Sequence, residues 1–122
     1  MRRLTLIDDC ADNRLLIQAL LGDRYHITEY ESGPPGLDGI RRTGADLVIL
    51  DISLPGMSGL EVLQHLKADS ATASIPVIAL TAHAMVGDRE RFLSAGFDDY
   101  VSKPIVDPSY LSAIIERLTE AR

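Results

Sequence analysis

Cysteine is nearly absent from this chain of 122 residues, in which Cys10 is the only one. A single thiol cannot form an intrachain disulfide, and a chain without disulfides is typical of a reducing cytoplasm. Three histidines, His26, His65 and His83, stand far apart in the sequence, and none pairs with another His or Cys at zinc-site spacing. These scarcities exclude a disulfide-stabilised fold and argue against a zinc site.

Positive charge and long apolar segments are also scarce. Lys and Arg number 12 against 18 Asp and Glu, so the formal net charge is −6. The pairs Arg2-Arg3 and Arg41-Arg42 are too short to form a basic surface, and direct binding to nucleic acid is not expected. The apolar stretch near the N-terminus is too short for a signal peptide or a membrane span. The composition therefore predicts a cytoplasmic protein without membrane insertion.

The length and composition are those of one domain. A chain of 122 residues that is 46% hydrophobic can bury a core of its own. It contains no linker, low-complexity stretch or internal repeat. We expect a single domain over residues 1–122 with no effector domain.

Short apolar runs alternate with longer segments of helical period. Strands are predicted at residues 4–8, 26–30, 47–51, 75–80 and 100–102, with helices after each. The helices are predicted at 12–21, from the Ser32 region to Gly44, from an N-cap at Ser58, at 86–95, and from Pro108 behind a cap at Asp107. This alternation predicts a parallel sheet with helices on both faces, because each crossover is right-handed.

The apolar faces of three helices are predicted from their spacing, and one helix carries unfavourable residues. Gly36 and Gly39 each cost about 1 kcal/mol relative to alanine inside a helix, so a short or mobile second helix is expected. The residues predicted to form the apolar faces are Leu15, Leu16, Ala19 and Leu20 in the first helix, Leu60, Leu63 and Leu66 in the third, and Leu111, Ile114, Ile115 and Leu118 in the last.

Acidic and basic residues stand where the apolar runs end. Asp8 and Asp9 close the first run, Asp51 closes the third, Thr81 follows the fourth, and Lys103 follows Tyr-Val-Ser. Because the carboxyl ends of parallel strands converge on one crevice, these side chains are expected to meet there. Three carboxylates, a hydroxyl and an ammonium suit a divalent cation and a phosphoryl group.

The three carboxylates require a counter-charge. Carboxylates about 5 Å apart repel by roughly 3 kcal/mol per pair at an effective dielectric constant near 20. Hard oxygen ligands favour Mg²⁺, with Mn²⁺ as a second choice. An aspartate beside such an ion can attack phosphorus and form an aspartyl phosphate. Lys103 and Thr81 are the candidates for neutralising charge on the transferred group.

Four segments around these residues resemble the receiver domain of two-component response regulators. They are Leu-Ile-Asp8-Asp9, Leu-Val-Ile-Leu-Asp51-Ile-Ser-Leu-Pro55-Gly56-Met57-Ser-Gly59, Ile-Pro76-Val-Ile-Ala-Leu-Thr81-Ala82, and Ala95-Gly96-Phe-Asp-Asp-Tyr100-Val-Ser-Lys103-Pro104. The resemblance covers the whole chain and is strongest to receivers of hybrid kinases and single-domain regulators. It implies a flavodoxin-like (βα)5 fold, a doubly wound parallel sheet of five strands in the order 2-1-3-4-5.

The resemblance also implies a role for each site residue. Asp51 would accept a phosphoryl group from a phosphohistidine. Asp9 and Asp51 would ligate Mg²⁺ directly, Asp8 mainly through water, and the backbone carbonyl of Ser53 would be a further ligand. The chain would catalyse its own phosphorylation and dephosphorylation, acting as a signalling module rather than a multiple-turnover enzyme.

Further roles concern the switch and the lifetime of the phosphorylated state. Thr81 and Lys103 would bind the phosphoryl oxygens, and Tyr100 would swing inward as Thr81 moves. The Lys103-Pro104 bond would be cis, which proline permits at a cost below about 1 kcal/mol. Side chains at Ser53 and His83 would tune how fast water removes the phosphoryl group. Cys10 departs from the family, in which a polar residue often follows the acidic pair. A partly buried, unreactive thiol is expected there, with a reactive thiol as the alternative.

The partners implied are proteins. A histidine kinase or histidine phosphotransfer protein would dock near the first helix and the loop after Pro104, with Asn13, Arg14, Ile17 and Gln18 as candidate contacts. Core packing is an equal expectation for Ile17. A downstream partner would bind the face made by residues 85–95, 100–102 and 108–118. There Phe92 is expected in the core, whereas exposure of Met85 or Val86 would indicate a partner groove.

Four alternatives remain at this point. The chain could be a hydrolase with an aspartyl nucleophile, although many such enzymes need a second acid where Ser53 stands. It could be a flavodoxin-like cofactor binder, although its first turn, Asp-Asp-Cys-Ala-Asp, lacks a phosphate cradle. It could be the receiver module of a hybrid histidine kinase phosphorelay, or a degenerate receiver that acts as a constitutive binding module.

Overall fold

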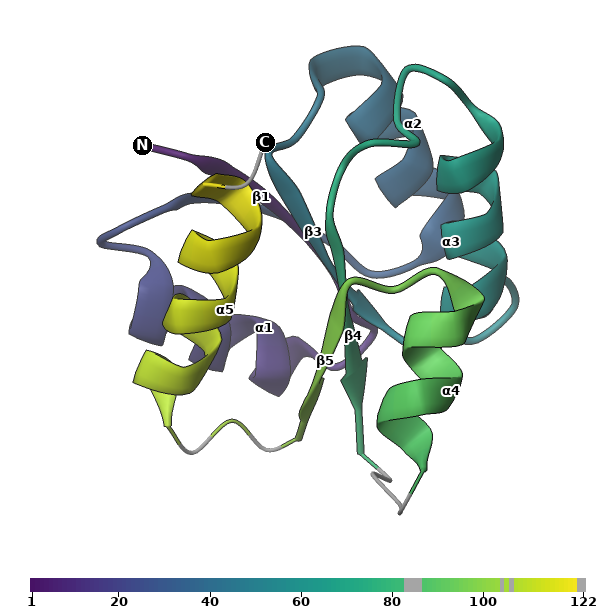
Figure 1. The fold of residues 1–122 in the computed structure, drawn as a ribbon. Helices are drawn as coiled ribbons and strands as arrows, with labels where there is room; N and C mark the ends of the chain where they lie inside the picture. Colours follow the sequence, from purple (N-terminus) through teal and green to yellow (C-terminus); the bar gives the residue numbers. More distant parts are fainter. Residues whose placement is uncertain (83–86, 104, 106, 121–122) are drawn as a thin grey trace.

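A computed structural model describes residues 1–82, 87–103, 105 and 107–120, in which strands and helices alternate along the chain (Figure 1). The elements are β1 (Arg3–Ile7), α1 (Ala11–Leu21), β2 (His26–Tyr30), α2 (Gly33–Thr43), β3 (Leu47–Asp51), α3 (Gly59–Ala68), β4 (Val77–Thr81), α4 (Asp88–Ala95), β5 (Asp99–Ser102) and α5 (Pro108–Glu120). No helix in these described ranges has the length and apolarity needed to cross a membrane.

The strands form one parallel sheet in the order β2-β1-β3-β4-β5. Helices α1 and α5 cover one face, and α2, α3 and α4 cover the other (Figure 1). This is the flavodoxin-like doubly wound arrangement, and it confirms the predicted fold class and strand order. In such a sheet the central strands are buried on both faces, as β3 is along its whole length.

The core has two layers, one on each face of the sheet. Successive strand residues point to opposite faces, so neighbours such as Ile49 and Leu50 belong to different layers. The layer under α2, α3 and α4 includes Ile7, Val48, Leu50, Val62, Leu63, Leu66 and Phe92. The layer under α1 and α5 includes Leu4, Leu6, Ile17, Leu21, Ile49, Leu111, Ile114 and Ile115. The predicted apolar face of α5 is therefore confirmed.

The predicted faces of α1 and α3 are partly wrong. Leu15 is 70% exposed and Ala19 is exposed, whereas Ile17 and Leu21 of the same helix are buried. Leu15 precedes Ile17 by two residues, about 200° around the helix, and so points away from the sheet. In α3, Leu63 and Leu66 are buried as expected, but Leu60 is 40% exposed and Val62 takes its place.

Of the expectation that α2 is short or mobile, the short length is wrong, since the helix runs for 11 residues. Its glycines are buried because neighbouring side chains pack directly on the backbone. A Cβ at Gly36 would collide with Ile7, and one at Gly39 would collide with the Tyr30 hydroxyl. The close packing offsets the helix-propensity cost of these two residues.

The predicted helix caps are confirmed, and one strand begins later than predicted. Ser58 Oγ accepts a hydrogen bond from Glu61 N at 3.3 Å, and Asp107 Oδ1 accepts one from Ser109 N at 3.0 Å. Strand β4 begins at Val77 rather than Ile75, because Pro76 has no N–H for the ladder. The predicted helix start at Val86 lies outside the described residues, and α4 is described from Asp88.

Candidate functional site

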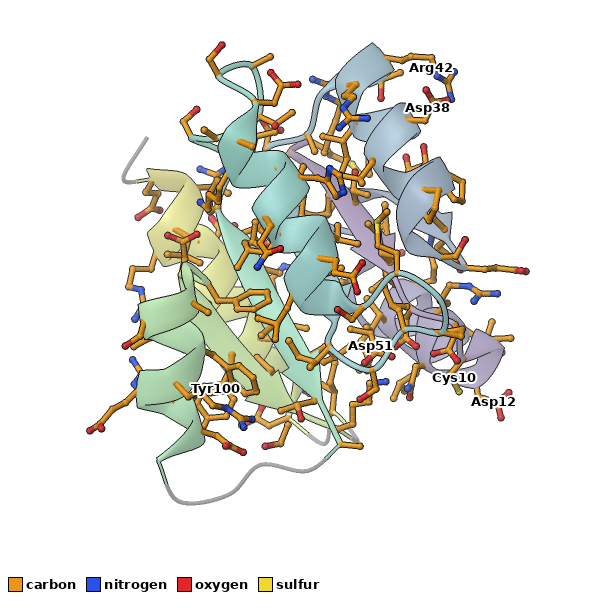
Figure 2. All side chains as sticks on the ribbon, turned by 90° about the vertical axis from the view of Figure 1, so that its right-hand side faces the viewer. Cys10, Asp12, Asp38, Arg42, Asp51 and Tyr100 are labelled. Atoms are coloured by element: carbon orange, nitrogen blue, oxygen red, sulfur yellow. The ribbon has the colours of Figure 1, made fainter. Side chains whose placement is uncertain are left out.

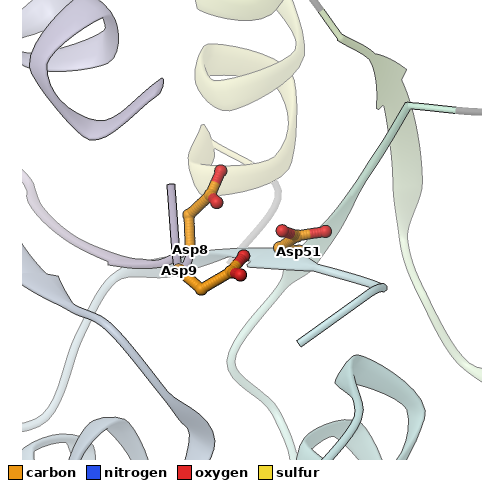
Figure 3. Close-up of side chains that lie close together, drawn as sticks. All are labelled: Asp8, Asp9 and Asp51. Atoms are coloured by element: carbon orange, nitrogen blue, oxygen red, sulfur yellow. The ribbon is translucent and has the colours of Figure 1, made fainter. Parts of the chain in front are cut away.

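Three carboxylates meet at the carboxyl edge of the sheet (Figure 3). Asp51 ends β3, and Asp8 continues β1 by donating its N–H to Tyr30 O at 3.1 Å. Ile7 lies opposite Leu50 in the sheet, so the acidic residues that follow them are brought to the same level. One carboxylate oxygen of each of Asp8, Asp9 and Asp51 lies within 4.8 Å of the other two. The predicted acidic cluster is therefore present.

The three acids differ in their access to solvent. Asp8 and Asp51 are buried, with 0% and 2% of their surface exposed, whereas Asp9 is exposed. Backbone N–H groups hold one oxygen of each buried acid: Cys10 N donates to Asp8 Oδ1 at 2.9 Å, and Ser53 N donates to Asp51 Oδ1 at 3.0 Å. These local bonds orient the two carboxylates within the turns that follow their strands.

Lys103 reaches the two buried carboxylates from the end of β5. Its Nζ lies 2.9 Å from Asp51 Oδ2 and 3.2 Å from Asp8 Oδ2. Its backbone N donates to Thr81 O at 2.7 Å, which ties the residue after β5 to the end of β4. The lysine side chain is only 15% exposed, so solvent screens these pairs weakly.

Burial and neighbouring charges shift the pKa values of two of these groups, Asp8 and Lys103. Burial raises the pKa of the Asp8 carboxyl and the charge of Asp51 adds to the rise, while the Cys10 N–H and Lys103 partly offset it. Burial alone would lower the pKa of Lys103, but its hydrogen bond to Asp51 and the charges of Asp51 and Asp8 outweigh this and raise it. Lys103 is therefore held firmly as an ammonium.

The donor set fits a hard divalent cation. Three negative charges and one positive charge leave the ionised cluster at −2, which one divalent ion would cancel. Among the described residues, buried Asp8 Oδ2 receives no aligned hydrogen bond, although Lys103 Nζ lies close to it. Carboxylate oxygens on a partly solvated edge are the ligands that Mg²⁺ and Mn²⁺ prefer.

The other predicted site residues fall in three groups. Thr81 is buried at the end of β4, next to the acidic cluster, and Ser53 is exposed beside Asp51. Tyr100 lies in β5 away from Asp51 (Figure 2), half-buried, with its ring centroid 5.8 Å from that of buried Phe92. Core packing of Phe92 is confirmed. The residues that lie outside the described part of the chain are His83, Met85, Val86 and Pro104, with the predicted cis bond of Pro104.

Of the two expectations for Ile17, core packing is confirmed and partner contact is wrong, whereas partner contacts by Asn13, Arg14 and Gln18 stay predictions. Ile17 is 1% exposed and belongs to the core, so it cannot anchor a partner. The Arg14 side chain is only 13% exposed, and its guanidinium points at the end of β1 rather than outward. Gln18 is half-buried and donates through Nε2 to Ile27 O at 3.1 Å. Helix α1 packs on the sheet through the face of Ile17 and Leu21, not through the face of Leu15 that its sequence pattern predicts.

Sequence reasoning missed two structural features, one at the site and one at the start of β5. Gly59 begins α3 in contact with the end of β3, where any Cβ would collide with Asp51 O. Asp99 is buried in β5 and receives Arg89 Nη1 of α4 at 2.8 Å and Arg117 Nη2 of α5 at 2.6 Å. The glycine next to Ser58 was a visible signal, but no local pattern reveals that Asp99 joins two helices.

Cys10 is exposed at the N-cap of α1 and makes no side-chain capping bond. The expectation that this thiol is partly buried is therefore wrong. The residue leaves the sheet edge in the same turn that carries Asp8 and Asp9, and Figure 2 shows it on the same side of the molecule as Asp51.

Comparison with known proteins agrees with this geometry. The model of the response regulator receiver domain family matches residues 4–116. The polar-differentiation response regulator DivK of Brucella ovis is 39% identical over 121 residues, which are 98% of this chain and 98% of DivK. The sensor protein GacS of Pseudomonas syringae pv. syringae is 33% identical over 118 residues, 93% of this chain, but the chain spans only 13% of GacS.

A solved structure supports the same assignment. The receiver domain of the sensor histidine kinase PA1611 of Pseudomonas aeruginosa PAO1 superposes with a TM-score of 0.88 at 31% identity, covering 98% of each chain. That structure is described as having a magnesium ion coordinated in its active-site cleft. The fold, the acidic cluster and these similarities together place the chain in the response regulator receiver domain family.

Proposed function

We propose that Asp51 accepts a phosphoryl group from the phosphohistidine of a histidine kinase or histidine phosphotransfer protein. The observation that carries this proposal is that Asp51 is at once a member of the acidic cluster and the partner of Lys103 at 2.9 Å. Asp8 belongs to the same cluster, but its Oδ2 lies farther from Lys103 Nζ, at 3.2 Å, and its raised pKa favours the protonated, less nucleophilic form. Asp9 is exposed and, among the described residues, has no lysine contact. Asp51 is therefore the acid best placed for nucleophilic attack.

The transfer exchanges one bond to phosphorus for another. An Asp51 carboxylate oxygen forms the new P–O bond as the P–N bond of the donor breaks, and the imidazole nitrogen keeps the electron pair of that bond. Charge on the transferring oxygens needs fixed cationic and hydrogen-bonding groups. Lys103, already in the site as an ammonium, and the Thr81 hydroxyl at the end of β4 would supply them.

Mg²⁺ would be held by Asp9 and Asp51, by Asp8 mainly through water, and by the backbone carbonyl of Ser53. When bound, the ion would neutralise the acidic cluster and polarise phosphoryl oxygens. The magnesium reported for the Pseudomonas aeruginosa receiver supports this choice of ion, with Mn²⁺ as a substitute. The residues that would surround it in this chain are the ones the strand ends bring together.

Phosphorylation would switch a protein-binding surface rather than drive turnover. Thr81 would move toward the phosphoryl group and Tyr100 would turn inward from its packing on Phe92. The surface would be the face of α4, β5 and α5, where Arg89 and Arg117 bond the buried Asp99. Changing the ratio of the active to the inactive conformation of this face from 1:99 to 99:1 needs about 5.5 kcal/mol of differential stabilisation.

Two further expectations belong to this proposal. His83 would tune the lifetime of the aspartyl phosphate, so its decay rate in His83→Ala would differ from that of the wild type. The same acceptor chemistry would serve a single-domain response regulator, as in DivK, or a receiver within a hybrid kinase, as the likeness to part of GacS suggests.

The test is incubation with acetyl phosphate, with and without Mg²⁺, followed by intact mass spectrometry. The proposal predicts a Mg²⁺-dependent gain of one phosphoryl group by the wild type and none by Asp51→Asn. Equal gain by both proteins would remove Asp51 from the role of acceptor. Binding of Mg²⁺ without any phosphorylation, by either acetyl phosphate or a phosphohistidine donor, would instead indicate a degenerate receiver that works as a constitutive binding module.

A further inference from the structure

We infer that Arg14 is a positioning residue of the cation site, acting through the backbone of the acidic turn. Its Nη1 donates to the carbonyl oxygen of Asp8 at 2.6 Å. Its Nε donates to Glu29 Oε1 of β2 at 3.2 Å, and its Nη2 lies 3.7 Å from Glu31 Oε1. The planar guanidinium thus spans from α1 to the edge strand and holds the acidic turn between them. This inference rests on the Mg²⁺ binding proposed above.

The bond to Asp8 O fixes the peptide that joins the two acids. A peptide group is planar, so holding its oxygen also sets the direction of the following N–Cα bond, which belongs to Asp9. On the other side of Asp8, its N–H donates to Tyr30 O at 3.1 Å. The backbone of Asp8 is therefore tethered at both ends, and the carbonyl end depends on Arg14.

Asp9 is the acid that depends most on this tether. The Asp8 and Asp51 carboxylates are each held by a backbone N–H and by Lys103. In the part of the chain that the structure describes, the exposed Asp9 carboxylate has no hydrogen-bond or ion-pair partner. Its aim toward the cluster comes from the backbone alone, and Arg14 is the side chain that orients that backbone.

A positioning role and a purely electrostatic role of Arg14 predict opposite changes in Mg²⁺ affinity when the residue is replaced. Arg14 carries a positive charge near a site for a cation, so deleting that charge would strengthen Mg²⁺ binding if charge alone mattered. Deleting a tether of the ligand backbone would weaken binding. Replacing a residue that hydrogen-bonds to a metal ligand typically lowers the affinity for the metal 10- to 100-fold. The lower end applies here because Asp9 would be one ligand among several.

The experiment is calorimetric titration of Mg²⁺ into the wild type, Arg14→Met and Arg14→Lys, without any phosphoryl donor. We expect Arg14→Met to bind Mg²⁺ about 10-fold more weakly. Arg14→Lys is expected to be intermediate, because an ammonium can reach Asp8 O or Glu29 but lacks the fork that joins them. Arg42→Met is the matched control, since Arg42 pairs with Asp38 on α2 far from Asp51 (Figure 2), and its affinity should match the wild type.

Unchanged or tighter binding by Arg14→Met would overturn the inference while leaving the proposed function intact. Failure of the wild type to bind Mg²⁺ would overturn both. Circular dichroism identifies a variant that does not fold, and in that case Arg14→Lys provides the test, with affinity equal to the wild type counting against the inference. Hydrogen exchange at residues 8–10 gives a second readout, and we expect it to be faster in Arg14→Met and unchanged in Arg42→Met.

Discussion

Lys103 Nζ lies 2.9 Å from Asp51 Oδ2, although the two residues stand 52 positions apart in the sequence. The contact joins the loop after β5 to the end of β3, across the intervening strand β4. It places an ammonium against Asp51, the proposed phosphoryl acceptor, before any phosphoryl group arrives. We therefore expect the stability of the cation-free protein to depend on this lysine.

Replacing Lys103 with Met should lower the free energy of unfolding in EDTA by about 3 kcal/mol. The variant leaves two buried carboxylates near each other without their positive partner. Urea denaturation measures the change. Lys67→Met is the control, because Lys67 is exposed and, among the described residues, its Nζ bonds the backbone carbonyl of Ala73 at 3.2 Å and no acid. Equal stability of the two variants would contradict the account of the cluster.

The raised pKa of Asp8 predicts a specific pH dependence. The folded protein holds a proton on Asp8 more tightly than the unfolded chain does, whose carboxyl titrates near the ordinary value of 3.8. The Asp8 contribution to stability therefore falls as pH rises from that value through the raised folded pKa. In EDTA, the stability of Asp8→Asn minus that of the wild type should increase with pH over this interval. A difference that stays flat, measured by urea denaturation, would contradict the shift.

The raised pKa of Lys103 predicts how stability changes at alkaline pH. Its pKa is raised above the ordinary 10.5, so the ammonium contributes stability that is fully present below pH 10.5 and is lost as pH rises through the folded pKa. Lys103→Met should lack this alkaline loss, whereas Lys67→Met should keep it. Thermal unfolding of the three proteins at alkaline pH measures the difference.

Substituting Gly39 with Ala should destabilise the protein by about 1–3 kcal/mol, although alanine is the better helix former. The added methyl group would collide with the Tyr30 hydroxyl under α2. Urea denaturation measures the effect. Tyr30→Phe should relieve it only in part, because it removes the hydroxyl but leaves the ring carbon Cζ 2.5 Å from the position of the added Cβ. Stabilisation by Gly39→Ala in the wild-type background would show that helix propensity outweighs this contact.

The two helix caps predict changes of opposite sign. Ser58→Ala should lower the free energy of unfolding by about 1 kcal/mol, because it removes the acceptor of Glu61 N.

Cys10→Ser should stabilise the protein by about 0.5–1 kcal/mol, because Cys10 caps α1 in an extended conformation without a side-chain bond. Equilibrium unfolding in urea measures both. Loss of stability in Cys10→Ser would mean that the thiol makes a contribution that capping geometry does not explain.

The topology and the acidic cluster could be predicted from the sequence because both depend on strand ends. Apolar runs that stop at Asp8, Asp51 and Thr81 place these residues at one edge of any parallel sheet. The contacts of Arg14, and the choice between core packing and partner contact for Ile17, could not be predicted in the same way. Which face of α1 packs on the sheet is set by contacts with β1, β2 and α5, and the local pattern with Leu15 favours a different face.

The glycines of α2 and the pairing of Asp99 were hidden for the same physical reason. A glycine lowers helix propensity wherever it stands, and only the packing of Ile7 and Tyr30 shows why Gly36 and Gly39 belong there. A buried carboxylate between two helices is likewise a contact between distant segments. Local sequence carries element type and strand ends, whereas these features depend on the finished tertiary structure.

Chemical mapping of the phosphorylated residue tests the proposed role of Asp51 most directly. Protein treated with acetyl phosphate and Mg²⁺ is reduced with borohydride, which converts an aspartyl phosphate to homoserine, and is then digested and sequenced by mass spectrometry. The account predicts homoserine at position 51, dependent on Mg²⁺ and absent in Lys103→Met or formed far more slowly. Homoserine at position 8 or 9, or phosphate on a histidine with Asp51 unmodified, would contradict it.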